Sequence, residues 1–283
     1  MDNRNKGILL MILSSLFFAL MATFVKLSGD LPTMQKVFFR NLLGLIVTAG
    51  IMIRSKQSFA GNNKKYLFYR SLFGLLGVFF YFFALDRLPL ADAVVLNQMN
   101  PFFVLLLAFF FLKESIRRSQ VVAILVALTG VIFIVKPQFD LTIIPALMGL
   151  SSSIFAASAY TIIRHLRLTD HPKVIVFYFT ALSSISAIPF WGQFVMPTPL
   201  QALALLAVGT FATAAQYMMT YAYRYAEASD LSIYSYGNTM FSILIGIIIW
   251  GELPDAYSFL GILLILSGAY LNYRSRKLQK APQ

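Results

Sequence analysis

The chain has 283 residues, of which 59% are hydrophobic and 12% charged, and its formal net charge is +12. Ordinary soluble domains contain about 25% charged residues, and a water-soluble fold of this length could not bury so much apolar surface in one core. The composition therefore indicates an integral membrane protein. It argues against a nucleic-acid-binding protein, because the basic residues lie in short segments between apolar runs.

Ten apolar runs are each long enough, at about 20 residues per crossing, to be transmembrane helices. In chain order they are Gly7–Val25, Met34–Ile53, Tyr66–Leu85, Ala91–Leu112, Gln120–Val135, Ile143–Ile163, Val174–Trp191, Leu200–Tyr223, Leu231–Trp250 and Ala256–Tyr273. The first run follows basic residues as a signal peptide would. Its apolar stretch is longer than a typical signal and lacks a clean cleavage site, so we expect a retained helix.

Loop charge predicts the orientation, because cytoplasmic loops are rich in Lys and Arg. If the N-terminus is cytoplasmic, the cytoplasmic segments hold 18 of the 23 basic residues. These are Arg4, Lys6, Arg54, Lys56, Lys64, Lys65, Arg70, Lys113, Arg117, Arg118, Arg164, Arg167, Lys173, Arg224, Arg274, Arg276, Lys277 and Lys280. We therefore expect a multi-pass protein of the cytoplasmic membrane with both termini in the cytoplasm.

The sequence repeats itself at a shift of 138 residues, which places Asp92 on Asp230. The repeat is supported by matches between residue types that are scarce in this chain. Without a gap, the same shift aligns Asn100 with Asn238, Glu114 with Glu252, and Gly130 with Gly268. Each half holds five helices, an odd number, so the second half must enter the membrane from the opposite side. We predict an all-α integral membrane protein with ten transmembrane helices in two inverted five-helix repeats, residues 1–137 and 138–283.

Several segments resemble the drug/metabolite transporter superfamily, EamA type. They are Leu88-Pro89-Leu90-Ala91-Asp92-Ala93, Phe111-Leu112-Lys113-Glu114 and Trp250-Gly251-Glu252. The resemblance covers nearly the whole chain, and it implies a bacterial cytoplasmic-membrane carrier, often an exporter of amino acids or other metabolites. Within the superfamily, a nucleotide-sugar carrier is the second reading.

No constellation of catalytic residues is visible in the sequence. None of the eleven acidic residues lies in the middle of a predicted span, and both histidines fall in one loop. The chain has no cysteine, which excludes thiolate ligands and cysteine nucleophiles. We therefore expect neither an enzyme nor a metal site, and no cofactor.

Arg40 is the exceptional charge, because it lies about six residues inside the second predicted helix. A charge at that depth costs roughly 2.5–3.5 kcal/mol unless it faces a wet cavity or a partner. Either Arg40 faces a central cavity and attracts a carboxylate or phosphate, or its long side chain reaches back to the headgroups. The repeat carries Tyr178 at the equivalent position.

The fourth and ninth predicted helices carry the densest polar groups. Asn97 and Asn100 are three residues apart and would share one helix face, with Gln98 beside them and Pro101 next. The repeat-related set is Tyr234, Ser235 and Asn238. Such amides either line a substrate site across the pseudo-twofold axis or form ordinary interhelical hydrogen bonds.

Further candidates come from amphipathic and acidic side chains. The hydroxyl groups of buried tyrosines need hydrogen-bond partners. Three tyrosines and one glutamine are therefore further candidates to line the cavity: Tyr81, Tyr160, Gln216 and Tyr217. Asp92 and Asp230, at helix ends, are candidates for coupling or gating. Glu114 and Glu252 are interpreted as helix-end anchors.

The sequence thus predicts a secondary transporter of a small organic metabolite, an amino acid or another carboxylate or amphiphile, working by alternating access and most often as an exporter. A non-transporting scaffold or sensor subunit is the main alternative, followed by a lipid-modifying enzyme. The expected partners are a small-molecule substrate and the lipid bilayer, with no nucleic acid, and a homodimer is left open.

Overall fold

The computed structural model describes residues 3–112, 118–135, 143–166, 169–226, 231 and 234–280; within these, the side chains of residues 108, 111–112, 135, 164, 220, 223–224 and 276–280 are not described. The described residues form helices and contain no strand. The helices are α1 (Asn3–Leu27), α2 (Thr33–Arg54), α3 (Lys64–Leu85), α4 (Leu90–Asn97), α5 (Asn100–Leu112), α6 (Arg118–Val135), α7 (Ile144–Leu166), α8 (Pro172–Ile185), α9 (Pro199–Tyr225), α11 (Gly237–Trp250) and α12 (Ala256–Lys280).

These helices form ten apolar transmembrane segments within the described part of the chain. Seven segments are long and apolar enough to cross a bilayer, with α4 and α5 together making one of them, and α6, α8 and α11 are shorter apolar helices. Many large apolar side chains face outwards, as Ile248 of α11 does with 79% of its surface exposed. Such a surface suits lipid, in which exposed apolar groups carry no penalty.

Helix boundaries follow from local sequence. The Asn63 side chain accepts a hydrogen bond from the backbone N–H of Tyr66 at the start of α3, and Thr198 with Gln201 forms a capping box at the start of α9. At the end of α11, Gly251 adopts a left-handed conformation with φ of 65°, which suits glycine. The chain can therefore reverse direction at the membrane surface without losing backbone hydrogen bonds.

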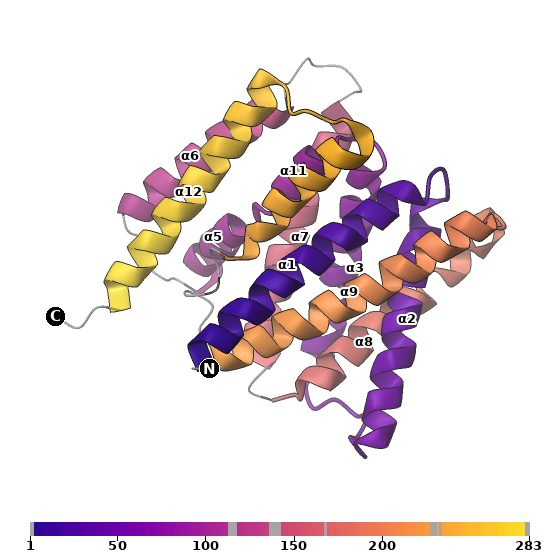
Figure 1. The fold of residues 1–283 in the computed structure, drawn as a ribbon. Helices are drawn as coiled ribbons and strands as arrows, with labels where there is room; N and C mark the ends of the chain where they lie inside the picture. Colours follow the sequence, from indigo (N-terminus) through magenta and orange to yellow (C-terminus); the bar gives the residue numbers. More distant parts are fainter. Residues whose placement is uncertain are drawn as a thin grey trace.

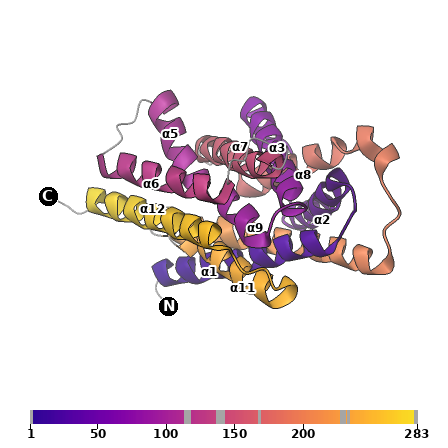
Figure 2. The same ribbon diagram turned by 90° about the horizontal axis from the view of Figure 1, so that it is seen from above.

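The chain's two ends lie at the same end of the helix bundle, as Figure 1 shows. We call this end, where α1 begins and α12 finishes, the N-terminal face, and the other end the opposite face. α6 and α12 lie side by side at one edge of the molecule, and α1 lies against α9 (Figures 1 and 2).

The packing repeats between the two halves. The 138-residue shift relates α1 to α7 and α9 to α3, and the pair α1–α9 packs much as the pair α7–α3 does. The same shift relates α6 to α12, so exchanging the two repeats exchanges these two helices and leaves their contact in place. A Cβ built on Gly130 would lie 2.6 Å from the carbonyl oxygen of Gly261, and one built on Gly268 would lie 2.7 Å from that of Ala123. The first contact becomes the second when the two repeats are exchanged, as a pseudo-twofold axis requires.

Three predicted spans are interrupted in the structure. The predicted fourth helix divides into α4 and α5, with a turn at Gln98 and Met99. The predicted seventh helix ends at Ile185 as α8 and continues as a 3₁₀ segment, η2 (Ile188–Gln193). The predicted ninth helix has a turn at Tyr236, after which α11 begins. The interruptions in the fourth and ninth segments fall at repeat-related positions, so the break is a property of the repeated unit. The predicted boundary between repeats, at residues 137 and 138, lies outside the described residues.

Candidate substrate-binding site

Arg40 lies inside the helix bundle. It is the eighth residue of α2, only 8% of its surface is exposed, and its Nη1 donates a hydrogen bond of 2.7 Å to Oδ1 of Asn41. Its Nε is buried and has no hydrogen-bond partner among the described residues. The guanidinium carbon lies 5.6 Å from the ring centroid of Phe179 on α8. The side chain is therefore buried inside the bundle rather than extended to the headgroups, and its role in binding an anion stays a prediction.

A pocket adjoins Arg40 between α2, α8 and α9. Its empty volume is about 300 Å³, part of which is open space around the protein. The residues that line it are Arg40, Asn41, Gly44, Val176, Phe179, Thr180, Ala212, Thr213, Gln216 and Tyr217. Asn41 and Phe179 occupy repeat-related positions, so both halves contribute to the same wall. The lining combines apolar and polar side chains, as small-molecule sites do. In this conformation the volume open to the centre of a water-sized sphere is about 20 Å³, which is room for about one water molecule.

Two of the aromatic and amide candidates line this pocket and two lie elsewhere in the interior. Gln216 and Tyr217 line the pocket, and the Tyr217 hydroxyl donates to Oγ1 of Thr48 at 3.2 Å. Tyr160 of α7 lies in the neighbourhood of Arg40. Tyr81 of α3 is 7% exposed and its hydroxyl has no hydrogen-bond partner among the described residues.

Arg70 is a second buried arginine, which we counted among the cytoplasmic basic residues from the sequence and did not name as a site candidate. It is the seventh residue of α3 and is 3% exposed, with its guanidinium carbon 4.0 Å from the ring centroid of Phe179. Its Nε and Nη1 are buried without a hydrogen-bond partner among the described residues. Tyr160 lies in the neighbourhood of Arg70 as well as of Arg40. The apolar run around Arg70 was the signal that pointed to a membrane position, but its closeness to Lys64 and Lys65 concealed it.

The amides of the fourth segment lie at its break rather than on one helix face. Asn97 is the last residue of α4 and donates to Oγ of Ser152 at 2.9 Å, and Asn100 begins α5 and donates to the Asn97 carbonyl at 2.9 Å. Pro101 has no N–H to offer that carbonyl, so the Asn100 side chain takes the place of the missing backbone donor. The expectation of a shared face on a continuous helix was wrong.

The two breaks contact each other across the pseudo-twofold axis. Nε2 of Gln98 donates to the carbonyl of Ser235 at 2.7 Å, and the Tyr236 hydroxyl donates to the carbonyl of Gln98 at 3.3 Å. Gln98 and Tyr236 are themselves related by the 138-residue shift. Tyr234 is partly buried against a small apolar cluster of α1 and α9, and its carbonyl accepts a hydrogen bond from Ser15. Hydrogen bonding between helices is the role that the structure shows for this junction.

Asn238 and Asp92 do not line the Arg40 pocket, and Asp230 lies outside the described residues. Asn238 is 8% exposed on α11 and its side-chain oxygen lies 3.5 Å from Oγ of Ser242. Asp92 is buried in the first turn of α4, where it accepts a hydrogen bond of 3.2 Å from Ser258 of α12. The candidate Asp230 lies outside the described residues, as does Glu114. Among the described residues no cluster of potential metal ligands occurs.

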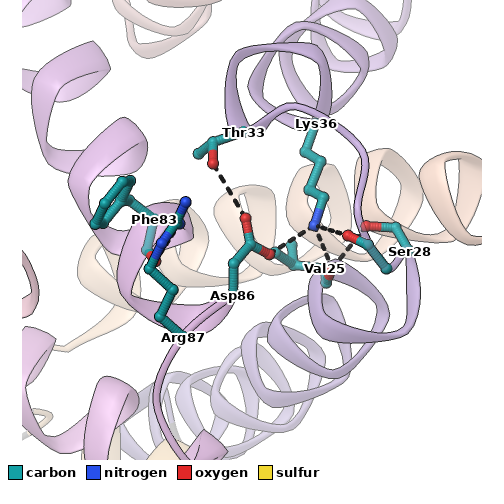
Figure 3. A network of polar contacts seen from close by, with 8 residues as sticks. Val25, Ser28, Thr33, Lys36, Phe83, Asp86 and Arg87 are labelled. Carbon is teal, nitrogen blue, oxygen red and sulfur yellow. Dashed lines mark hydrogen bonds and ion pairs between the residues drawn. The ribbon is translucent and has the colours of Figure 1, made fainter. Parts of the chain in front are cut away.

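The opposite face is held together by ion pairs. Lys36 at the start of α2 contacts Asp86 at 2.6 Å, as Figure 3 shows. The Lys36 ammonium also donates to the carbonyl of Gly29. Asp86 accepts a further hydrogen bond from Thr33 at 3.1 Å. Burial raises the pKa of Asp86, and the charge of Lys36 opposes that rise.

A second ion pair joins the two repeats at the same face. Lys26 at the end of α1 pairs with Glu252, in the segment after α11. The same carboxylate accepts a hydrogen bond of 2.9 Å from the backbone N–H of Leu90, and Lys26 donates to the carbonyl of Leu88. The position of Glu252 as a helix-end anchor is thus the one that the sequence indicated.

Comparisons with known proteins place this arrangement among membrane transporters. The model of the EamA-like transporter family matches residues 5–136 and 143–274. The pseudopaline exporter CntI of Pseudomonas aeruginosa is 34% identical over 98% of this chain and 99% of its own length. An uncharacterized transporter of Helicobacter pylori is 30% identical over 94% of this chain and 93% of its own. A solved crystal structure at 20% identity superposes with a TM-score of 0.70 over 99% of this chain and shares its fold.

Proposed function

This chain belongs to the EamA-like transporter family, and on that premise we propose that it carries a small metabolite bearing a carboxylate, which binds at Arg40. The family makes it a multi-pass membrane transporter of small metabolites. The single observation that carries the proposal is a buried guanidinium with no acidic partner among the described residues.

A buried charge without a partner needs a reason to be there. Removing one member of a buried ion pair typically costs about 3–5 kcal/mol, because the other charge is left uncompensated. Arg40 is in that situation unless an anion enters the pocket, and its Nε is a free donor aimed at no described residue. A planar guanidinium matches a carboxylate with two parallel hydrogen bonds. A substrate carboxylate would supply both the missing charge and the missing acceptor.

The charge distribution supports a cytoplasmic N-terminal face, even with Arg70 removed from the loop count. The pseudopaline exporter, which is similar over nearly its whole length, works outwards by name. We therefore propose export across the cytoplasmic membrane, with both termini in the cytoplasm. In this orientation the ion pairs of the opposite face close the pocket from the outside.

The inverted repeat suggests how the two faces alternate. Two inverted halves can exchange conformations, which opens one side as the other closes. The tie at the opposite face consists of Lys26, Glu252 and the N–H of Leu90. The 138-residue shift turns these into Arg164, Glu114 and the N–H of Ala228, whose contacts lie outside the described residues. We propose that this second set closes the N-terminal face when the first set separates.

The test is flux of carboxylate-bearing solutes through purified protein in proteoliposomes. A panel of amino acids and organic acids is loaded inside, and efflux is compared for wild type and Arg40→Gln. Arg87→Gln is the matched control, because Arg87 is an exposed arginine that also contacts an aromatic ring, 3.7 Å from the centroid of Phe83. We expect Arg40→Gln to reduce efflux at least tenfold and Arg87→Gln to preserve it. If Arg40→Gln transports every carboxylate as the wild type does, the proposal is wrong.

A further inference from the structure

We infer that the substrate carries two carboxylates, and that Arg40 and Arg70 together select such dicarboxylates over monocarboxylates. The inference rests on the proposed function and names the substrate class for the same site. It depends on Arg70, a residue that lies on a different helix from Arg40 and is not among the pocket-lining residues.

The first step is that both arginines converge on one aromatic ring. The guanidinium carbons lie 5.6 Å (Arg40) and 4.0 Å (Arg70) from the centroid of Phe179, so they cannot be further apart than the sum of these distances. The two helices run in opposite directions, and each long side chain must extend towards Phe179 to meet there. The two guanidinium groups are therefore close enough together for one small dicarboxylate to span them.

The second step is that the fold makes room for the Arg70 guanidinium. Gly74 lies one turn further along α3, where a Cβ would be 2.9 Å from Cε2 of Phe179 and 3.0 Å from Nη1 of Arg70. Any side chain at this position would push the ring and the guanidinium apart. The close stacking of Arg70 on Phe179 thus depends on this glycine.

The guanidinium groups of Arg40 and Arg70 bring two positive charges and several hydrogen-bond donors into the interior. The ion pairs that the structure shows among the described residues, Lys26 with Glu252 and Lys36 with Asp86, lie at the opposite face and involve neither arginine. Three buried donors of the two guanidinium groups have no hydrogen-bond partner in the described part of the chain: Nε of Arg40, and Nε and Nη1 of Arg70.

A monocarboxylate would leave one of these two buried charges uncompensated, whereas a molecule with two acidic groups neutralises both. The free donors belong to two separate groups that meet at a ring, so the geometry favours two separated carboxylates over one compact dianion. Tyr160 lies in the neighbourhood of both guanidinium groups.

The experiment measures binding to the purified full chain in detergent by isothermal titration calorimetry. The probes are succinate, glutarate and adipate, each compared with its monomethyl ester, which has the same carbon chain but one carboxylate. Inorganic phosphate is included as the compact dianion. The variants are Arg70→Gln, the charge-preserving Arg70→Lys, and Arg87→Gln as the control.

We expect at least one dicarboxylate to bind the wild type ten or more times as tightly as its monomethyl ester. Arg70→Gln should bring that ratio close to one without weakening the binding of the monoester. Arg70→Lys should keep a preference for the dicarboxylate, and Arg87→Gln should keep the wild-type ratio. Elution as a single sharp peak in size-exclusion chromatography shows that each variant is folded.

Three results would overturn the inference: equal affinity for diacid and monoester in the wild type, an unchanged ratio in Arg70→Gln, or phosphate binding more tightly than every dicarboxylate. A failure of all three dicarboxylates to bind would also overturn it. The proposed function fails separately, when carboxylate efflux does not depend on Arg40. A carrier that moves monocarboxylates through Arg40 with no preference for diacids would retain the function and lose only this inference.

Discussion

At the scale of single residues, the buried polar groups of this bundle are of two kinds. Some form hydrogen bonds within the protein, and others are donors without a partner among the described residues. The amides at the break of the fourth segment have partners, such as the Asn97 carbonyl for Asn100 and the Ser235 carbonyl for Gln98. The donors of Arg40 and Arg70 named above do not. A polar group that is hydrogen-bonded within the protein stabilises the fold. A buried donor without a partner carries a desolvation penalty, which a ligand that accepts its hydrogen bond would remove.

This contrast predicts that Asn100→Ala affects stability and not substrate recognition. The change leaves the Asn97 carbonyl without its donor, and a buried unsatisfied group costs about 1–3 kcal/mol. We expect the thermal unfolding temperature in detergent to fall while the KM for efflux in proteoliposomes stays within twofold of wild type. A rise of tenfold or more in KM with unchanged thermal stability would return Asn100 to the substrate site.

Sequence reasoning identified Arg40 and overlooked Arg70 as a site candidate for the same physical reason. A charge is conspicuous only when apolar residues surround it on both sides in the chain, and Arg70 follows Lys64 and Lys65 by a few residues. Burial depends on the neighbouring helices, here α8 with Phe179, and a single helix sequence does not reveal them. The involvement of Phe179 was likewise not predicted, because an apolar aromatic residue in a membrane helix carries no distinguishing signal.

At the scale of helices, apolar length predicted where the transmembrane segments lie but not where they break. The span as a whole is apolar enough to read as one helix from Ala91 to Leu112, although Asn97, Gln98 and Asn100 make it polar around the α4–α5 break. Pro101 gave a partial signal, since it frees a carbonyl one turn earlier. The corresponding break before α11 has no proline, and it is recognisable only through the repeat.

Close approach of α6 and α12 gives a prediction at this scale. Gly130→Ala would place a methyl group 2.6 Å from the carbonyl oxygen of Gly261, which forces the two helices apart. We expect the unfolding free energy to fall by about 1–3 kcal/mol. The matched control is Gly50→Ala in α2, where an added Cβ meets nothing within 4 Å.

The control should be neutral or stabilising, because alanine favours a helix over glycine by about 1 kcal/mol. Both variants can be followed by chemical denaturation in detergent with the same helical signal. Equal stability of Gly130→Ala and Gly50→Ala would contradict the tight packing of α6 against α12.

At the scale of the whole molecule, the two halves share a fold but not a charge pattern. The repeat places Tyr178 and Val208 where the first half has Arg40 and Arg70. The two halves can thus exchange conformations about the pseudo-twofold axis, while both buried arginines belong to the first half. The inverted repeat was predictable from scarce residue types at one shift. The meeting of α2, α3 and α8 at one ring was not, because those contacts join distant parts of the chain.

The central claim is that the pocket beside Arg40 is a positively charged site for an anion, and the absence of native cysteine allows a direct measurement of its electrostatics. Thr180 lines the pocket, so Thr180→Cys introduces a single thiol there. Its rates of reaction with anionic MTSES and cationic MTSET are measured in detergent and divided by the same rates at an exposed Ser58→Cys. The account predicts that the anionic reagent is favoured about tenfold in the pocket, and that Arg40→Gln reduces this preference. Equal normalised rates, or a preference for the cationic reagent, would contradict it.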